Sequence, residues 1–303
     1  MGETHPMAKW TADDIPDQTG RTILITGANS GLGLRSAEAL SAKGARVLMA
    51  CRNEQKAAVA LEAVTAVASG TEPETVKLDL SDLSSVRDTA ARLNEQLDSI
   101  DVLMNNAGIM AVPYAQTVDG FESQLGTNHL GHFALTNLLL PKVTDRVVTV
   151  SSMMHLLGVI SLKDLNWKAR PYSAWLAYGQ SKLANLLFTS ELQHRLDAAG
   201  STVRAVAAHP GYSATNLQGH AASRFSSAVL QVGNKLATDA DFGARQTLYA
   251  VANDVPGNSF IGPRFGVRGS TGESPRSPLA NSASTARALW DQSEQLTDVR
   301  YPL

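Results

Sequence analysis

A tyrosine and a lysine, Tyr178 and Lys182, stand four residues apart in a stretch with helical periodicity. Residues at positions i and i+4 share a helix face, so the ammonium group can lower the pKa of the phenol. Bringing a tyrosine from its usual pKa near 10 to about 7 takes roughly 4 kcal/mol. A desolvated lysine and a positively charged bound ring together could supply that energy. The pair is a candidate general acid and base, and a solvated surface pair is the alternative.

Two further polar residues could act with this pair. Ser152 comes shortly after a β-branched run that ends at Val150, where its hydroxyl can bond to a substrate carbonyl or simply cap a turn. Asn128 falls inside a predicted helix, a position that asparagine fills poorly, so it has a polar role or is a hydrogen-bonded core amide. The candidate catalytic residues are Asn128, Ser152, Tyr178 and Lys182.

A glycine-rich turn, 26–33, lies between a predicted strand and a predicted helix. Gly27 permits a tight turn, Gly31 a close approach of the backbone to a pyrophosphate, and Gly33 close packing of helix on strand. The helix N-terminus then faces the phosphates. The turn predicts a dinucleotide site, although a tight turn without a ligand has the same glycines. Its candidate cofactor contacts are Gly27, Asn29, Ser30, Gly31 and Leu32.

The residue after the second predicted strand indicates which dinucleotide binds. An Asp or Glu there binds the ribose 2′-hydroxyl of NAD. This chain instead has Cys51 followed by Arg52, with Arg35 also near the turn. A guanidinium can pair with a 2′-phosphate, so Arg52 favours NADP(H), and a solvated arginine at a strand end is the alternative.

Short β-branched runs alternate with helical segments along most of the chain, which indicates a parallel sheet covered on both faces. The fold class is therefore α/β, a single-domain Rossmann-type doubly wound parallel sheet with helices on both faces. Asn53 and Ser81 are predicted helix caps. Strands are expected at 21–26, 45–50, 75–78, 101–105, 146–150, 202–207 and near Phe260. Helices are expected at 31–43, 53–68, 81–97, 119–139, 174–199, 239–252 and 283–295.

One domain, 21–303, is expected to follow an N-terminal arm, 1–20, that packs through Trp10 and Ile15. Insertions near 153–173 and 212–238 interrupt the alternation just after strand ends, where ligands bind in such sheets. Residues 257–282 are rich in Pro and Gly and predict a poorly ordered loop.

The composition excludes several classes of protein. The net charge of the 303 residues is −2, which argues against a nucleic-acid binder. The single cysteine, Cys51, cannot form an intrachain disulfide, and the seven histidines show no spacing typical of a metal site. A long uncharged stretch, 123–141, is too polar for a membrane span, and the N-terminus lacks the apolar core of a signal peptide. We therefore expect a soluble cytoplasmic protein.

Taken together, these motifs resemble the short-chain dehydrogenase/reductase family over about 21–261. The branch that this chain resembles most holds retinol dehydrogenases, WW-domain-containing oxidoreductases and protochlorophyllide reductases. That similarity rests on the segments 50–52, 127–133, 151–155 and 178–185, and the tail 262–277 departs from it. The matching residues are Thr26, Gly27, Gly31, Gly33, Asp79, Asn105 to Gly108, Asn128, Ser152, Tyr178, Lys182, Pro210, Gly211 and Thr215.

The resemblance implies that Asn128, Ser152, Tyr178 and Lys182 form a catalytic tetrad in which Asn128 supports Lys182. It implies that Asp79 contacts the adenine and that Arg52 marks a preference for NADP(H). It also implies a homodimer that pairs through a long helix such as 174–199. The further cofactor contacts are Asp79, Leu80, Asn106, Ala107, Gly108, Tyr178, Lys182, Pro210, Gly211 and Thr215, the last of which can bond a nicotinamide carboxamide.

The expected reaction is reversible hydride transfer between the nicotinamide of NADP(H) and a small-molecule carbonyl or alcohol. Apolar residues in the two insertions favour a lipophilic substrate, although they could equally pack a lid or a subunit contact. These residues are Leu156, Leu157, Val159 and Ile160 in one insertion and Leu217, Phe225, Val229 and Leu230 in the other. Two alternatives stay open: a non-catalytic NADP(H)-binding sensor or interaction protein, and an NADPH-dependent reductase of a C=C bond.

Overall fold

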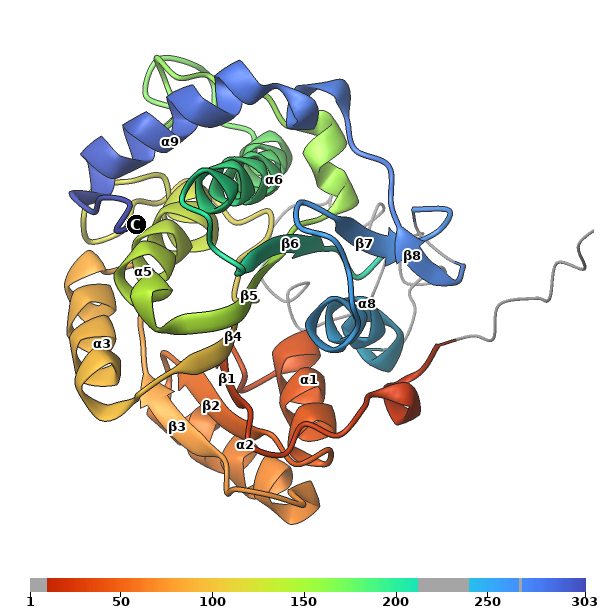
Figure 1. The fold of residues 1–303 in the computed structure, drawn as a ribbon. Helices are drawn as coiled ribbons and strands as arrows, with labels where there is room; N and C mark the ends of the chain where they lie inside the picture. The colour runs from red at the N-terminus through yellow and green to blue at the C-terminus, as the bar shows by residue number, and fades with distance from the viewer. Residues whose placement is uncertain (1–9, 212–239, 267–268) are drawn as a thin grey trace, which may run out of the picture.

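The computed structural model describes residues 10–211, 240–266 and 269–303. Its centre is an eight-stranded sheet in the order β3-β2-β1-β4-β5-β6-β7-β8 (Figure 1). The first seven strands run parallel, and β8 pairs antiparallel with β7 at one edge. The strands are β1 (Thr22–Thr26), β2 (Arg46–Cys51), β3 (Glu74–Lys77), β4 (Ile100–Asn105), β5 (Val143–Val150), β6 (Arg204–Ala208), β7 (Phe260–Pro263) and β8 (Thr271–Glu273).

Helices cover both faces of the sheet, as Figure 1 shows. Helices α3, α5 and α6 lie on one side, with α9 packed outside α6, and α1, α2 and α8 lie on the other. The expected doubly wound α/β fold is therefore confirmed. The helices are α1 (Gly31–Ser41), α2 (Glu54–Val67), α3 (Leu83–Gln96), α4 (Ser123–Leu125), α5 (Gly131–Leu139), α6 (Ala174–Ala198), α8 (Ala240–Ala252) and α9 (Ala283–Thr297).

Alternation of side chains along the central strands divides the core in two. Leu24 of β1 contributes to the layer under α3, α5 and α6, whereas Ile23 and Ile25 contribute to the layer under α1, α2 and α8. All three side chains are fully buried. Both faces of the strand are therefore covered, which explains its uninterrupted run of apolar residues.

Three local expectations were wrong. The cap of α3 is Asp82, not Ser81, because the Asp82 carboxylate accepts hydrogen bonds from the amides of Ser84 and Ser85. The helix expected over 119–139 begins only at Ser123 and contains a π-helical turn, Gly126–Leu130. The segment 257–282, expected as a loop after the strand near Phe260, holds the strand β8 and a 3-10 helix, η6 (Pro278–Asn281), in addition to the expected strand β7.

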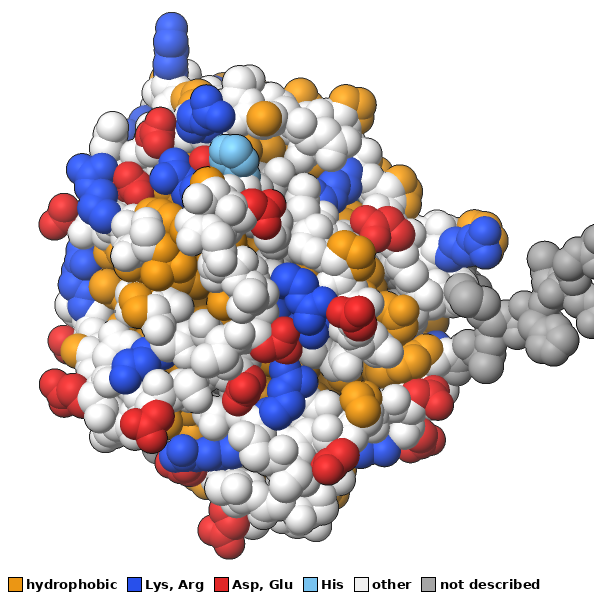
Figure 2. All heavy atoms as spheres, viewed as in Figure 1, with side chains coloured by type: hydrophobic (Ala, Val, Ile, Leu, Met, Phe, Trp, Pro, Cys, Tyr) orange, Lys and Arg blue, Asp and Glu red, His pale blue; other side chains and the backbone are white. Residues whose placement is uncertain are grey.

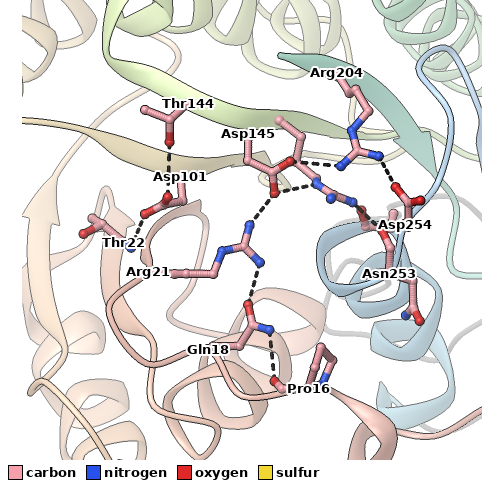
Figure 3. Close-up of polar contacts among 12 residues, drawn as sticks. Pro16, Gln18, Arg21, Thr22, Asp101, Thr144, Asp145, Arg204, Asn253 and Asp254 are labelled. Carbon is pink, nitrogen blue, oxygen red and sulfur yellow. Dashed lines mark hydrogen bonds and ion pairs between the residues drawn. The ribbon is translucent and has the colours of Figure 1, made fainter. Parts of the chain in front are cut away.

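A cluster of charged side chains links the amino ends of the central strands, on the edge of the sheet opposite the glycine turn (Figure 3). Asp145 of β5 accepts hydrogen bonds from Arg21 before β1, from Arg204 of β6 and from its neighbour Arg146. The buried Arg146 also donates to the carbonyl of Asn253, 2.6 Å away, just after α8. The cluster thus joins three strands to the end of a helix.

The N-terminal segment packs on the α8 side of the sheet. Ile15 is buried, and the Trp10 ring meets the Tyr249 ring edge-on at 5.3 Å between centroids. Acidic and basic side chains are interspersed over the face in Figure 2, in keeping with the net charge of −2. Among the described residues, no helix is long and apolar enough to span a bilayer. The same part of the chain holds no group of three or more potential metal ligands.

Candidate active site

The glycine turn joins β1 to α1 at the carboxyl edge of the sheet. Gly27 and Gly31 have φ of +68° and +54°, a region that favours glycine. A methyl group on Gly33 would lie 2.4 Å from the carbonyl oxygen of Gly27, so only glycine lets the helix begin this close to the turn. The N-terminus of α1 therefore opens at the turn, as a phosphate-binding site requires.

A cavity of about 1010 Å³ lies over this edge of the sheet. Its size and its glycine cradle fit a dinucleotide, the group that the turn predicts. Most of the predicted cofactor contacts line it. They are Gly27, Asn29, Ser30, Gly31, Leu32, Arg52, Asp79, Leu80, Asn106, Ala107, Gly108, Tyr178, Lys182 and Pro210.

Four predicted site residues are not part of this lining. Asn128 and Ser152 are not among the lining residues, but each neighbours a residue that is, Ile109 and Tyr178 respectively. Gly211 follows Pro210, and its amide donates to Nδ1 of His209 at 3.2 Å. Thr215 and the insertion 212–238 lie outside the described residues.

Two cations line the cavity where β2 ends. Arg52 was predicted, but Lys56 was not, and both side chains are exposed. Asn53 caps α2 by accepting a hydrogen bond from the Lys56 amide at 2.8 Å, which starts the helix directly after Arg52. Lys56 lies four residues after Arg52 in the sequence, and this second nearby cation was the signal available for it. Arg35 instead forms ion pairs with Glu38 and Asp241 and is not part of the lining.

Tyr178, Ser152 and Lys182 come together where β5 ends and α6 begins. The Ser152 hydroxyl is a neighbour of the Tyr178 phenol and lowers its pKa, and Nζ of Lys182 lies 5.6 Å from the centre of the phenol ring. Lys182 Nζ also donates to the carbonyl of Val150 at 3.1 Å. The predicted pair therefore shares one helix face and is not a solvated surface pair, because both side chains are buried.

The pKa values of this pair differ from the sequence expectation. Burial raises the pKa of Tyr178 to about 12, and the neighbouring Ser152 hydroxyl only partly opposes this rise. Burial also lowers the pKa of Lys182 to about 8. The protein's own groups therefore do not lower the pKa of Tyr178 toward neutral pH. Of the two contributions considered from the sequence, the positive charge of a bound, oxidised nicotinamide is the one that remains to lower this pKa.

Asn128 holds the backbone that forms one wall of the cavity. Its Oδ1 accepts from the Ile109 amide at 2.8 Å, and its Nδ2 donates to the Ile109 carbonyl at 2.9 Å. Nδ2 also donates to Ser181 Oγ, which in turn donates to the Tyr178 carbonyl. A methyl group on Gly108 would lie 3.1 Å from Asn128 Oδ1 and 3.5 Å from Lys182 Nζ. Asn128 and Lys182 therefore both lie next to Gly108, and Asn128 is also linked through Ser181 to the Tyr178 carbonyl, which sequence reasoning missed.

A buried histidine links Asn128 to the glycine turn. His132 Nδ1 lies 3.0 Å from the carbonyl of Asn128, and Nε2 lies 2.8 Å from Thr26 Oγ1. Burial lowers the pKa of His132 to about 4, so the ring is neutral, with Nδ1 donating to the carbonyl and Nε2 accepting from Thr26. Thr26 Oγ1 in turn accepts from the amides of Asn106 and Ala107. The lone histidine gave no signal of this link in the sequence.

Comparison with known proteins agrees with this fold. The short chain dehydrogenase family matches residues 21–224. Human retinol dehydrogenase 13 is 39% identical over 295 residues, which cover 93% of this chain and 86% of that protein. A crystal structure of an uncharacterized protein from Mycobacterium paratuberculosis is 57% identical, with a TM-score of 0.84 and coverage of 97% of this chain and 100% of that one.

A more distant structure has the same fold. The short chain dehydrogenase from Burkholderia cenocepacia, solved in complex with NADP, is 20% identical with a TM-score of 0.64 and covers 84% of this chain and 98% of its own. The chain belongs to the short-chain dehydrogenase/reductase family, which consists of oxidoreductases that bind a nicotinamide cofactor and act on small molecules. Within that family, its relatives place it in the branch of the retinol dehydrogenases.

Proposed function

We propose that this oxidoreductase uses NADP(H) to interconvert a lipophilic carbonyl compound and its alcohol. The observation that carries the proposal is the meeting of Tyr178, Ser152 and Lys182 at a dinucleotide-sized cavity. Two cations, Arg52 and Lys56, line the same cavity beside β2, which β1 and β4 separate from β5.

In this proposal Tyr178 is the general acid and base. During reduction its phenol gives a proton to the carbonyl oxygen, and during oxidation it takes the proton from the alcohol. The nicotinamide, when bound, supplies or accepts the hydride. Ser152 orients the same oxygen, since its hydroxyl neighbours the Tyr178 phenol.

Lys182 and Asn128 support this proton transfer. The Lys182 ammonium group, held by the Val150 carbonyl, places a positive charge near the phenol and close to Gly108 on the cavity wall. Asn128 fixes the backbone of Ile109 and, through Ser181, the backbone of Tyr178. Together they hold the reacting groups in one arrangement, which lowers the cost of reaching the transition state.

The choice of NADP(H) follows from charge. Arg52 can form paired hydrogen bonds with a 2′-phosphate, and Lys56 adds a second positive charge on the same side of the cavity. Neither position carries the carboxylate that would bind an unmodified ribose.

The lipophilic substrate is inferred from exposed apolar side chains that follow Ser152 in the chain. Leu156, Leu157 and Val159 follow Ser152 and are 53%, 54% and 57% exposed. Ile160 is partly buried and packs on the core, so it does not share this role. The relatives are named for retinol, an extended apolar alcohol, and we propose a substrate of that chemical class. The apolar residues expected in the second insertion lie outside the described residues.

The proposal is tested by titrating the purified chain with NADPH and with NADH, followed by fluorescence. We expect tighter binding of NADPH and NADPH-dependent reduction of lipophilic aldehydes or ketones. If the chain reduces a C=C bond and no carbonyl, its reaction is C=C reduction and the proposed carbonyl reduction is wrong. Binding of NADPH without turnover of any carbonyl would instead support a sensor or interaction protein.

Two expectations about the whole protein remain proposals. A cytoplasmic location is tested by cell fractionation. Homodimer formation through α6 is tested by light scattering of the purified chain at several concentrations.

A further inference from the structure

We infer that His155 is a positioning residue that holds Ser152 in place and ties it to the chain around Ser277. The inference rests on the proposed function, in which the Ser152 hydroxyl orients a substrate oxygen. His155 belongs to the segment 151–155 and Ser277 ends the unusual tail 262–277, and neither has a part in the proton transfer described above.

Both ring nitrogens of His155 have partners. Nδ1 lies 2.8 Å from the carbonyl oxygen of Ser152, and Nε2 lies 3.1 Å from the amide nitrogen of Ser277. A carbonyl can only accept and an amide can only donate. The ring is therefore neutral, with its proton on Nδ1 and a lone pair on Nε2. This tautomer uses both nitrogens of the fully buried side chain.

These bonds restrain Ser152 near its reacting hydroxyl. The Ser152 carbonyl also accepts from the backbone amide of His155 at 3.0 Å, which closes a turn of the 3-10 helix η4 (Met153–Leu157). Ser152 Oγ accepts from the Met154 amide and neighbours the Tyr178 phenol, whose pKa it lowers. A shift of the Ser152 carbonyl would therefore move the hydroxyl relative to the Tyr178 phenol.

The other side of the imidazole is fixed by the C-terminal part of the chain. Ser277 is buried, and its Oγ accepts from the Ala280 amide at 3.2 Å to cap η6. The ring of Phe260 on β7 meets the His155 ring edge-on at 5.5 Å. His155 thus joins two segments that lie 122 residues apart in the chain.

Two variants of similar size test the two hydrogen bonds of the His155 ring separately. His155→Asn places an amide donor near the position of Nδ1 and keeps the bond to Ser152, whereas His155→Gln places its amide near Nε2 and loses that bond. We expect kcat for carbonyl reduction to fall about 10- to 100-fold in His155→Gln and to recover most of that loss in His155→Asn. The dissociation constant for NADPH, followed by fluorescence, stays within about twofold of wild type in both variants.

A second pair of variants tests the Ser277 amide. The φ of Ser277 is −64°, which proline adopts, so Ser277→Pro removes the N–H donor without requiring a new φ. Ser277→Ala keeps that amide and loses only the hydroxyl cap. We expect kcat to fall several-fold further in Ser277→Pro than in Ser277→Ala, with similar melting temperatures.

The inference is overturned if His155→Gln reduces carbonyls as fast as His155→Asn, or if NADPH affinity falls as much as kcat. Equal kcat in the two Ser277 variants would also overturn it. In each of these outcomes the wild-type chain still reduces carbonyls, so the proposed function is unaffected. A wild-type chain that reduces no carbonyl removes the proposed function and this inference together.

Discussion

Tyr178 and Lys182 lie one helical turn apart, and burial shifts their pKa values in opposite directions. Burial raises the pKa of Tyr178 to about 12 and lowers that of Lys182 to about 8, because each buried group prefers its neutral form. At neutral pH the phenol therefore keeps its proton. It is in the state that carbonyl reduction needs, whereas alcohol oxidation needs the phenolate.

This difference predicts opposite pH behaviour for the two directions of the reaction. We expect kcat for reduction to change little between about pH 6 and pH 8. Over the same range kcat for oxidation should rise, by up to about tenfold per pH unit, because the phenolate fraction grows. Steady-state rates in both directions check this. Oxidation that slows as the pH rises would exclude Tyr178 as the base.

Removing the two cations beside β2 should change the choice of cofactor. We expect Arg52→Ser and Lys56→Ser each to weaken NADPH binding about 10- to 100-fold and to leave NADH binding nearly unchanged. The reason is that the 2′-phosphate loses a charge-assisted hydrogen bond. Fluorescence titration measures both affinities. Arg287→Ser, an exposed position on α9, is the matched control, and an equal loss of NADPH affinity there would contradict the assignment.

At the scale of single residues, those with a recognisable spacing could be predicted from the sequence. Those whose partners are distant in the chain could not. Tyr178 with Lys182 and the glycine turn were predicted from spacing alone. His132 reaches Thr26 across 106 residues, and His155 reaches Ser277 across 122, so no local pattern could reveal either. Asn128 was chosen as a polar residue inside a helix, but its partner Ser181 lies on another element.

At the scale of elements, a contact between two glycines sets how closely η4 approaches α6. A methyl group on Gly158 would lie 2.3 Å from the carbonyl oxygen of Gly179, the residue after Tyr178. Because Ser152 caps η4 and Tyr178 lies in α6, this contact helps to set the spacing of their hydroxyl groups. The φ of Gly158 is −74°, so the need for glycine is one of space and not of backbone conformation.

Gly158→Ala should therefore push the two elements apart. We expect a loss of about 1–3 kcal/mol in the free energy of unfolding, as overpacking usually costs, and at least a tenfold lower kcat. Urea unfolding and steady-state kinetics measure the two effects. Gly272→Ala on β8 is the control, since a methyl group there meets no atom within 4 Å. Equal behaviour of the two variants would show that the contact does not matter.

The elements themselves were largely predictable, because buried parallel strands have short apolar runs and helices such as α1 and α6 end shortly before a glycine, Gly44 and Gly200. The π-helical turn around Asn128 was not, since the hydrogen bonds of Asn128 to Ile109 and Ser181 come from other parts of the chain. β8 was missed because Thr271–Glu273 is short and has no apolar alternation. Its hydrogen bonds to β7 define it as a strand.

At the scale of the whole molecule, buried neutral histidines tie distant segments together. Burial lowers the pKa of His129 and His209 to about 3 and that of His132 to about 4, and it also lowers the pKa of His155. His129 bonds to Ser293 of α9 and His209 to Ser274 after β8. Each ring must lose its proton when the chain folds in mild acid.

Acid should therefore destabilise the fold before its carboxylates titrate. Below the usual histidine pKa of about 6.5 the unfolded chain binds protons that the folded chain does not, so stability falls as the pH falls. We expect a loss of up to about 1.4 kcal/mol per pH unit for each histidine between about pH 6.5 and pH 5. The pKa of Glu122 is raised in the folded chain, so this group stabilises the fold as the pH falls. It is one group against four histidines, so the net effect of acid is still a loss of stability. Urea unfolding at pH 7 and at pH 5 measures the change, and equal stabilities would contradict it.

The central claim is that Tyr178 transfers the proton in an NADP(H)-dependent carbonyl reduction, and Tyr178→Phe tests it most directly. The account predicts a kcat at least about 100-fold below wild type with NADPH affinity unchanged, because only the hydroxyl group is lost. Tyr114→Phe, at an exposed tyrosine outside the cavity lining, should behave as wild type. Carbonyl reduction by Tyr178→Phe at the wild-type rate would contradict the account.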